Sequence, residues 1–398
     1  MDGSNPVTGR RGVNQSGVRD HNERLLLSML RRLGPTPGSD LARLSGLSPQ
    51  TVSIILRKLE KDAILKRGDP IRGKVGKPSI PMHLNPNGVL SLGLRVGRRS
   101  ADLLLLDFTG AVRKQAHIAY QHPVPDEIFS FLENGITEFL ADLSEDARAR
   151  ICGIGIAMPF ELWKWHSDGP ETEPMKHWEG IDFPQVVAQF SELPVFVDND
   201  ATAACQAEHL HGRGSDFRDY AYFFIGSFIG GGVVLNGTVF EGHQGNAGAL
   251  GALRSTGPSG ESRQLVDVAS LHLLESRLND AGIDPGILWQ TPQDWSSIMR
   301  YADPWIGETA QELAKASLSI CSVIDFEAIL IDGSFPSEIR EALVERVRRY
   351  LVTQDTRGLI TPRIEAGAIG PNARGLGAAS SPIVAQFMLD TNSGLGRG

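Results

Sequence analysis

The spacing of apolar residues changes at residues 85–88, Asn-Pro-Asn-Gly, and this change separates two regions of different fold class. Before it, apolar residues recur three and four positions apart, which is typical of short helices that bury one face. After it, apolar runs alternate with helical segments and glycine clusters, which indicates an α/β domain. With 398 residues, 41% of them hydrophobic, the chain is long enough for each region to bury its own core.

Three helices are predicted in the first region. Residues 1–19 lack apolar periodicity and predict a flexible arm, after which a first helix runs from near Asp20 to Gly34. Ser39 is predicted to cap a short second helix that stops at Gly46. Ser48 followed by proline is a strong start signal for a third helix. The predicted buried positions are Leu26, Met29, Leu30, Leu33, Leu41, Ala42, Leu44, Val52, Ile55, Leu56 and Leu59.

A short helix, a glycine-containing turn and a capped helix with a polar start form the helix-turn-helix pattern, whose second helix enters the DNA major groove. A three-helix protein-binding bundle has the same periodicity, so the helices alone leave both interpretations open. We expect the polar residues at the helix start to reach base edges and the basic residues to meet phosphates. The candidate DNA-binding residues of this helix are Ser48, Gln50, Thr51, Ser53, Arg57 and Lys58.

A basic, glycine-broken loop follows the third helix. Residues 64–66 and 79–82 predict two short strands on either side of it. Its side chains Arg72, Lys74 and Lys77 can enter a minor groove or bind phosphates. An ordinary solvated loop is the alternative, but the density of basic residues and the position favour a wing. Residues 20–85 therefore predict a winged helix-turn-helix domain.

The charge distribution agrees with DNA binding by this region alone. The first 80 residues hold 15 of the 39 Lys and Arg residues but only 7 of the 47 Asp and Glu residues. A basic head on an acidic body indicates that only the head meets a polyanion. The apolar run at 25–30 is too short to cross a bilayer, and we expect a cytoplasmic protein.

In the second region, apolar runs and helical patterns predict two lobes, at about 86–200 and 201–390. Strands are predicted at 92–96, 101–108, 151–158, 194–198, 220–226, 233–240 and 329–332, and helices at 127–143, from 201 and at 338–351. The glycines at 230–232 are predicted to form the turn of a hairpin. Three cysteines, far apart in sequence, fit neither a disulfide framework nor a metal site and are predicted as core residues.

Five segments of this region resemble the ROK family, which unites repressors and sugar kinases of the actin-like, hexokinase-like ATPase fold. They are residues 153–159, 197–204 with Glu208, 226–234, 245–251 and 370–379. The resemblance runs from about residue 22 to residue 390, and the winged head is what the repressor branch adds. It implies a sugar-responsive repressor similar to those of the xylose and N-acetylglucosamine types.

The same resemblance implies that kinase chemistry is lost. Asp200 stands where the family's kinases hold their catalytic base, although an aspartate opening a helix is also an ordinary N-cap. Arg95 replaces the metal-side carboxylate of the phosphate hairpin, and Phe228 interrupts the second glycine loop. Ala249 and Ala252 replace the Glu and His that hold sugar in the family's kinases. In zinc-containing members that His binds the metal together with three nearby cysteines, and residues 253–275 contain no cysteine. We therefore expect neither enzyme activity nor a cofactor or metal.

Sugar binding is still predicted. An amide and carboxylate pair in the predicted cleft can fix sugar hydroxyls, and indole faces can pack against a pyranose ring. The tryptophans could instead form a lid or a subunit contact. The candidate sugar-binding residues are Asn199, Asp200, Asn246, Trp163, Trp165 and His166.

These features favour a transcriptional regulator. The resemblance implies that it is a repressor of carbohydrate genes and that a sugar releases it from DNA. The resemblance also implies a homodimer or homotetramer, and two heads in one assembly suit a palindromic operator. A sugar kinase that uses ATP is the principal alternative. A third is an adaptor that uses its head to sequester another protein.

Overall fold

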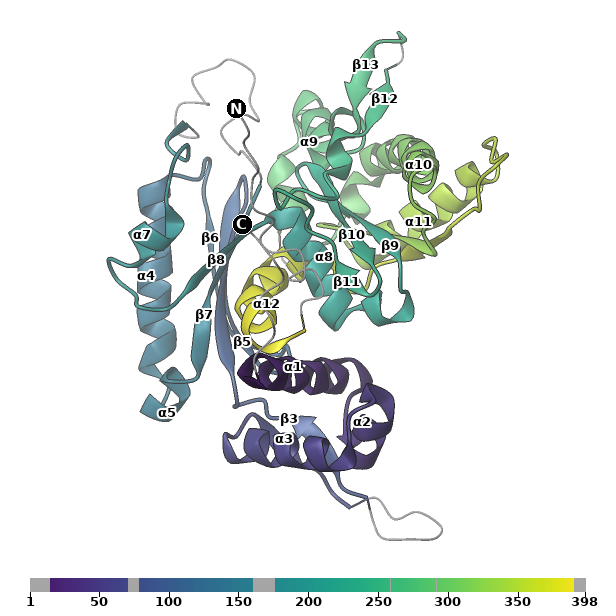
Figure 1. Cartoon of the computed structure of the whole chain (residues 1–398). Coiled ribbons are helices and arrows are strands. Elements are labelled where there is room, and N and C mark those ends of the chain that lie inside the picture. The colour runs from purple at the N-terminus through teal and green to yellow at the C-terminus, as the bar shows by residue number, and fades with distance from the viewer. Residues whose placement is uncertain (1–14, 71–78, 160–175, 258, 291, 390–398) are drawn as a thin grey trace, which may run out of the picture. The chain divides into compact units, whose positions relative to one another are not determined.

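The computed structural model describes residues 15–70, 79–159, 176–257, 259–290 and 292–389. The chain forms two compact units (Figure 1). The first contains Met1–Gly88 and, unexpectedly, Val384–Leu389 from the other end of the sequence; the second contains Val89–Ile383. The break at Gly88 coincides with the change in apolar spacing.

The helices of the first unit are α1 (Gln15–Leu33), α2 (Gly38–Ser45) and α3 (Pro49–Lys61). Because α1 begins at Gln15, the predicted flexible arm of residues 1–19 was too long. The predicted cap at Ser39 was also wrong, since Pro37 is the N-cap and makes no side-chain cap bond. The stop at Gly46 is confirmed, because this glycine adopts the left-handed conformation that ends a helix (φ 73°).

A small sheet completes this unit, with β1 (Thr36–Pro37), β3 (Pro81–Leu84) and β2 (Leu65–Arg67) in that order. β2 and β3 are antiparallel, as predicted for the wing strands, whereas two-residue β1 is too short to show a period in the sequence. The predicted core positions are buried except Leu33 and Leu44, which are 44% and 51% exposed.

Ten of the described strands of the second unit form two five-stranded sheets of the same topology. The first has the order β6-β5-β4-β7-β8 and the second β11-β10-β9-β14-β15. In each, three antiparallel strands are followed by two that are added in parallel. The strands are β4 (Leu90–Val96), β5 (Ser100–Asp107), β6 (Val112–Ala119), β7 (Ile151–Met158), β8 (Val195–Asn199), β9 (Tyr220–Ile225), β10 (Ile229–Leu235), β11 (Thr238–Val239), β14 (Ala328–Gly333) and β15 (Arg363–Ala366). The predicted two-lobed α/β architecture is thus confirmed.

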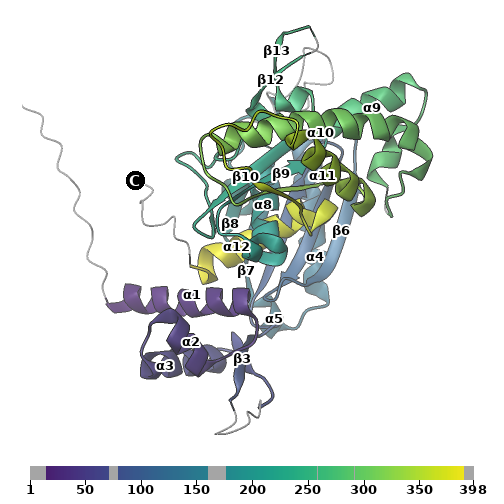
Figure 2. The same ribbon diagram turned by 90° about the vertical axis from the view of Figure 1, so that its right-hand side faces the viewer.

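Helices cover the outer face of each sheet. α4 (Pro125–Ala141), α5 (Glu145–Arg148) and α7 (Phe183–Val187) belong to the first lobe. α9 (Leu271–Asp280), α10 (Met299–Cys321) and α11 (Ser337–Leu351) belong to the second, where α10 and α11 lie side by side (Figure 2). A short hairpin and several 3-10 turns complete this unit: β12 (Arg254–Thr256), β13 (Ser262–Gln264), η3 (Arg213–Asp216), η4 (Leu250–Ala252), η5 (Leu265–Asp267), η6 (Pro285–Trp289), η7 (Ser296–Ile298) and η8 (Gly370–Asn372).

Two helices, α8 (Asp200–His211) and α12 (Ala373–Phe387), lie between the two sheets (Figure 1). They approach each other and the first sheet so closely that side chains are excluded at the crossings. A Cβ on Gly377 of α12 would lie 1.8 Å from the carbonyl oxygen of Ala203, and one on Gly155 of β7 would lie 1.8 Å from that of Ala378. Several motif glycines therefore serve helix and sheet packing.

The glycines at 230–232 do not form the predicted turn. They lie within β10, where Gly230 pairs with Phe224 and Gly232 with Tyr222, and the chain turns earlier, at residues 226–228. Glycine is required there because β10 packs against α8: a Cβ on Gly230 would lie 2.7 Å from that of Ala201.

The burial of the three cysteines predicts that their thiols react slowly in the folded protein. Cys205 and Cys321 are buried, Cys152 is half-buried, and all three are free thiols. Desolvation raises the pKa of all three, that of Cys152 to about 12, so little thiolate forms at pH 8. We expect 5,5′-dithiobis(2-nitrobenzoate) to label fewer than one thiol per chain in the folded protein and three in urea. Rapid labelling of folded protein would contradict this packing.

No helix within the described part of the chain is long and apolar enough to cross a membrane.

Candidate ligand pocket and DNA-binding surface

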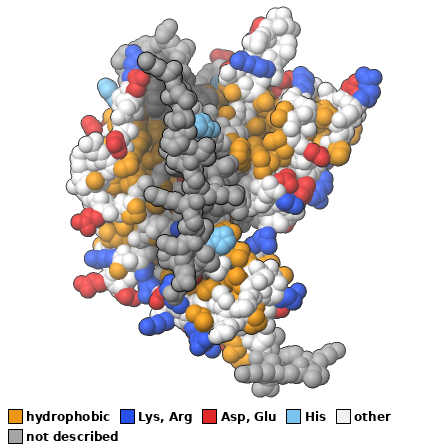
Figure 3. All heavy atoms as spheres, in the orientation of Figure 1, with side chains coloured by type: hydrophobic (Ala, Val, Ile, Leu, Met, Phe, Trp, Pro, Cys, Tyr) orange, Lys and Arg blue, Asp and Glu red, His pale blue; other side chains and the backbone are white. Residues whose placement is uncertain are grey.

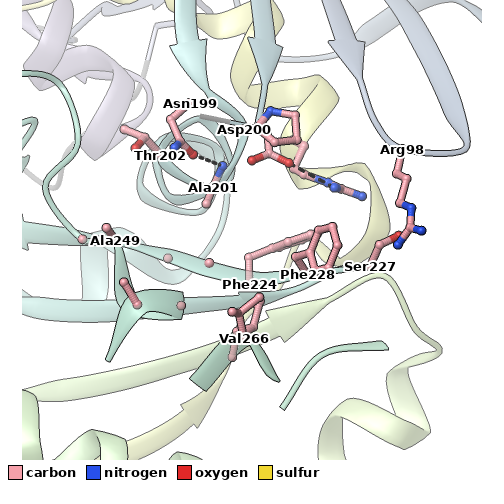
Figure 4. Close-up of a pocket in the computed structure, with 18 of the residues that line it drawn as sticks. Arg98, Asn199, Asp200, Ala201, Thr202, Phe224, Ser227, Phe228, Ala249 and Val266 are labelled. Carbon is pink, nitrogen blue, oxygen red and sulfur yellow. Dashed lines mark hydrogen bonds and ion pairs between the residues drawn. The ribbon is translucent and has the colours of Figure 1, made fainter. Parts of the chain in front are cut away.

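A cavity of about 650 Å³ opens in the second unit (Figure 4). Its walls come from the β4–β5 turn, the start of α8, the β9–β10 turn, the glycine loop at 246–252 and the start of α12. Predicted site residues Asn199, Asp200 and Asn246 all line it, although Asn246 lies 46 positions after Asp200 in the sequence. The fold thus brings the predicted amide and carboxylate groups together.

Asn199 and Asp200 have separate tasks at the end of β8. The Oδ1 atom of Asn199 accepts a hydrogen bond from the backbone N–H of Ala201 at 2.9 Å, so Asn199 is the N-cap of α8. The alternative that Asp200 is an ordinary N-cap was therefore wrong. Instead, Oδ2 of Asp200 accepts a hydrogen bond from Nη1 of Arg374 at 3.1 Å, in an ion pair that is largely buried.

Arg374, which contacts Asp200 across 174 positions of the sequence, was not among the predicted site residues. Its Nη2 donates to Ser334 Oγ at 3.2 Å, and its guanidinium lies 4.9 Å from the centre of the Phe224 ring. Burial, and then the positive charge of Arg95, lower the pKa of Arg374. The one available signal was a lone charge in the small-residue stretch 370–379.

The side chain of Arg95 fills the inside of the β4–β5 turn. Nε of Arg95, at the end of β4, lies 2.8 Å from Oδ2 of Asp102 on β5, and Nη2 donates to the carbonyl oxygen of Ser100 at 3.0 Å. A Cβ on Gly97 would lie 2.8 Å from Nη1 of Arg95. The guanidinium therefore occupies the inside of the turn.

The two substituted hairpins meet each other across the pocket. The guanidinium of Arg98, from the β4–β5 turn, lies 5.5 Å from the centre of the Phe228 ring in the β9–β10 turn. His272 packs on the same ring at 5.2 Å, and its Nδ1 lies 3.2 Å from the carbonyl oxygen of Ser227. Burial is the main cause that lowers the pKa of His272, so the imidazole is neutral at pH 7.

The remaining predicted pocket residues have different outcomes. Ala249 and Ala252 line the cavity, so its wall is apolar at the two positions where the resemblance implies a Glu and a His in the kinases. Trp163, Trp165 and His166 lie outside the described residues. Among the residues that the structure describes, no three His, Cys, Asp or Glu side chains gather where they could hold a metal ion.

The candidate DNA-binding surface is the exposed face of α3. Ser48 caps this helix by accepting a hydrogen bond from the N–H of Thr51 at 3.1 Å, and the two hydroxyl groups lie 2.8 Å apart. Gln50, Ser53 and Arg57 are exposed on the helix, and their contact with DNA stays a prediction. Lysine and arginine side chains of the first unit are visible at its surface (Figure 3).

Other residues of this surface differ from expectation. The ammonium group of Lys58 lies 2.6 Å from a carboxylate oxygen of Glu23 on α1, so a phosphate would have to compete with that ion pair. Ile54, which sequence analysis passed over, is 50% exposed beside Ser53; its departure from the buried 52, 55, 56, 59 series was the available signal. The wing residues Arg72, Lys74 and Lys77 lie outside the described residues.

Three helices with a wing, followed by two sheets of one topology around a pocket, define a winged helix-turn-helix protein with a hexokinase-like second domain. Residues 91–264 match the ROK family and residues 19–66 match the winged helix-turn-helix DNA-binding family. The chain therefore contains a ROK family domain behind an N-terminal winged helix-turn-helix.

Known transcriptional regulators resemble this chain in sequence or in fold. The chain is 24% identical to the DNA-binding transcriptional dual regulator NagC of Escherichia coli K12 over 315 residues, covering 78% of this chain and 75% of NagC. It is 25% identical to the xylose repressor of Bacillus spizizenii over 239 residues, 60% of this chain and 62% of that repressor. A crystal structure of a ROK-family transcriptional regulator, homologous to the E. coli MLC protein, superimposes with a TM-score of 0.65 at 20% identity, covering 93% and 97% of the two chains.

Proposed function

We propose that this protein is a DNA-binding transcriptional repressor of carbohydrate uptake or catabolism genes, controlled by a sugar that binds in the pocket. The observation that carries the proposal is the division of the pocket lining. Asn199, Asp200 and Asn246 keep groups that can bind sugar hydroxyls, whereas side chains stand where a kinase would hold ATP phosphates. Such a pocket supports binding without phosphoryl transfer.

The arrangement of the two hairpin turns argues against catalysis. Phosphoryl transfer requires a metal-orienting carboxylate and backbone amides that approach the phosphates. Arg95 occupies the first turn in its ion pair with Asp102, and Arg98 packs on Phe228 from the second turn. Asp200, the counterpart of the catalytic base, is engaged by Arg374. We therefore assign the pocket a sensing role and treat kinase activity as the alternative.

The first unit supplies the surface that binds DNA. α3 offers Gln50 and Ser53 for base edges and Arg57 for phosphates, and the exposed Ile54 side chain suits a thymine methyl group. A dimer or tetramer would present at least two such helices, which fits a palindromic operator. We place the protein in the cytoplasm with that DNA.

Helix α12 supports a route from ligand to DNA. It carries Arg374 near its start, while its last residues belong to the DNA-binding unit. There, Ser28 of α1 accepts a hydrogen bond from the N–H of Leu389 at 2.8 Å, and Arg24 donates to the carbonyl oxygen of Ala385 at 3.2 Å. A ligand that moves the Asp200–Arg374 pair would thereby act on α1. To change operator occupancy tenfold, the ligand's binding free energies for the DNA-bound protein and the free protein must differ by about 1.4 kcal/mol.

Substitutions on α3 test the DNA-binding surface. We expect Arg57→Gln to weaken binding to all duplexes by about tenfold and to reduce the salt dependence, because a phosphate contact is lost. Ser53→Ala should weaken binding chiefly to the preferred sequence. Fluorescence anisotropy at two salt concentrations measures both effects. The exposed Arg43 on α2 provides a control, Arg43→Gln, and an equal loss in that variant would contradict the assignment.

The proposal as a whole is tested by selecting duplexes from a random pool with the full chain, then adding a panel of sugars to the complex. Enrichment of one palindrome, released by a member of the panel, is the expected result. ADP formation from ATP with any of these sugars, lost in Asp200→Asn, would favour the kinase instead. Absence of sequence enrichment by folded protein would overturn the repressor.

A further inference from the structure

The described residues that line the pocket carry a surplus of positive charge. Sugar hydroxyls are neutral and need hydrogen-bonding groups, as Asn199 and Asn246 provide, but no excess of cations. The charged residues of the lining are Arg95, Arg98, Arg99, Arg374, Asp200 and Asp267. Even when Asp102, which pairs with Arg95, is counted as well, four guanidinium groups stand against three carboxylates, and this surplus favours a ligand that is itself an anion.

The arginines gather toward one side of the pocket. Arg95, Arg98 and Arg99 all come from the β4–β5 turn. In Figure 4, Arg98 lies beside Ser227 at one end of the view and Ala249 at the other, with Asp200 between them. The pocket thus has guanidinium groups at one end. Beside them lie amide and carboxylate groups that can bind the hydroxyls of a sugar.

An anion at the guanidinium end would relieve an existing repulsion. Arg95 and Arg374 are both buried, and the charge of Arg95 contributes to the lowered pKa of Arg374. The carboxylates of Asp102 and Asp200 hold these two arginines in place. Arg98 is positioned by the Phe228 ring and Arg99 by its hydrogen bond to the carbonyl oxygen of Gln121 at 2.8 Å. These fixed guanidinium groups suit the planar, paired recognition of carboxylate or phosphate oxygens.

We propose that the pocket binds an acidic sugar, a monosaccharide that carries a carboxylate or a phosphate group. Its hydroxyls bind to Asn199, Asp200 and Asn246, and its anionic group binds to Arg98 and Arg99. This inference deepens, and rests on, the proposed sensing function. It explains why the first hairpin has become basic although the nucleotide chemistry of that turn is gone.

Calorimetric titration of the full chain tests the ligand class. The panel contains glucose, galactose and mannose, the uronate and the 6-phosphate of each, and ATP with Mg²⁺. We expect at least one acidic member to bind ten times more tightly than its neutral parent, with an affinity that falls as salt is raised. Tighter binding of a uronate or of a 6-phosphate identifies which anion the arginines prefer.

Two arginine variants locate the effect. Arg98→Gln should weaken binding of the acidic member at least tenfold and leave the neutral parent unchanged within twofold. Arg300→Gln is the matched control, because Arg300 also packs on an aromatic ring, that of Tyr301 at 4.6 Å, but does not line the pocket. This control should bind as the natural chain does.

Three outcomes would overturn the inference: equal binding of neutral and acidic members, no binding by any acidic sugar, or tightest binding by ATP. Since DNA is absent from the titration, its result is independent of the repressor assignment. If a neutral sugar binds the pocket and releases the protein from its operator, only the proposal of an acidic ligand is wrong. If the protein binds no DNA, only the repressor assignment is wrong.

Discussion

Gly377→Ala is expected to destabilise the second unit by about 3 kcal/mol, whereas Gly307→Ala is expected to stabilise it by up to about 1 kcal/mol. Both glycines lie inside helices, α12 and α10 respectively. A Cβ on Gly377 would lie 1.8 Å from the backbone oxygen of Ala203, so the backbone of α8 or α12 must move. A Cβ on Gly307 meets only the tip of the Arg346 side chain, at 3.5 Å.

Urea unfolding followed by tryptophan fluorescence measures both changes. All six tryptophans lie between residues 163 and 305, so the signal reports on the second unit without interference from the DNA-binding unit. The difference between the two variants should therefore be about 4 kcal/mol. If Gly377→Ala unfolds at the same urea concentration as Gly307→Ala, the close contact between α8 and α12 is wrong.

The second large effect is expected at the ion pair between α8 and α12. The side chains of Asp200 and Arg374 are only 15% and 10% exposed. Asp200→Ala leaves a buried guanidinium without its carboxylate and should cost about 3 kcal/mol of stability. Arg374→Met should also destabilise the protein. The double variant should lose clearly less than the sum of the two, because neither charge is then left alone.

Glu345→Ala is the control for this cycle. Its carboxylate pairs with Arg349 on the surface of α11, where the side chains are 51% and 72% exposed, so its loss should cost less than about 0.5 kcal/mol. Strictly additive losses in the Asp200 and Arg374 variants would show that the pair is not coupled. Sugar binding should be lost in Asp200→Ala whatever the stability result.

The sequence allowed the helices of the head and most strands of the body to be predicted, because their apolar residues follow regular periods. Val52, Ile55, Leu56 and Leu59 are all buried on α3. Strand β6 was missed because it alternates half-buried and exposed residues with a largely polar sequence. α12 was missed because Gly375, Gly377 and Pro382 weaken a helical pattern that tertiary packing nevertheless stabilises.

The site was predicted only where residues share one strand end or one motif. Asn199 and Asp200 are adjacent at the end of β8, and Asn246 lies in a neighbouring motif, so their convergence followed from the resemblance. Arg374 and the contact of Arg98 with Phe228 were not predicted, since they depend on how separate lobes and α12 come together. The local sequence pattern contains no information about contacts between residues so far apart in the chain.

The central claim is that a pocket in a kinase-like domain controls DNA binding by the head. It is tested most directly by measuring anisotropy of the full chain on its selected palindrome while the ligand found by calorimetry is added. We expect operator affinity to change at least tenfold in the natural chain and to stay constant in Asp200→Ala, which retains the head but not the ligand site. A ligand that saturates the pocket without changing operator affinity would contradict the account.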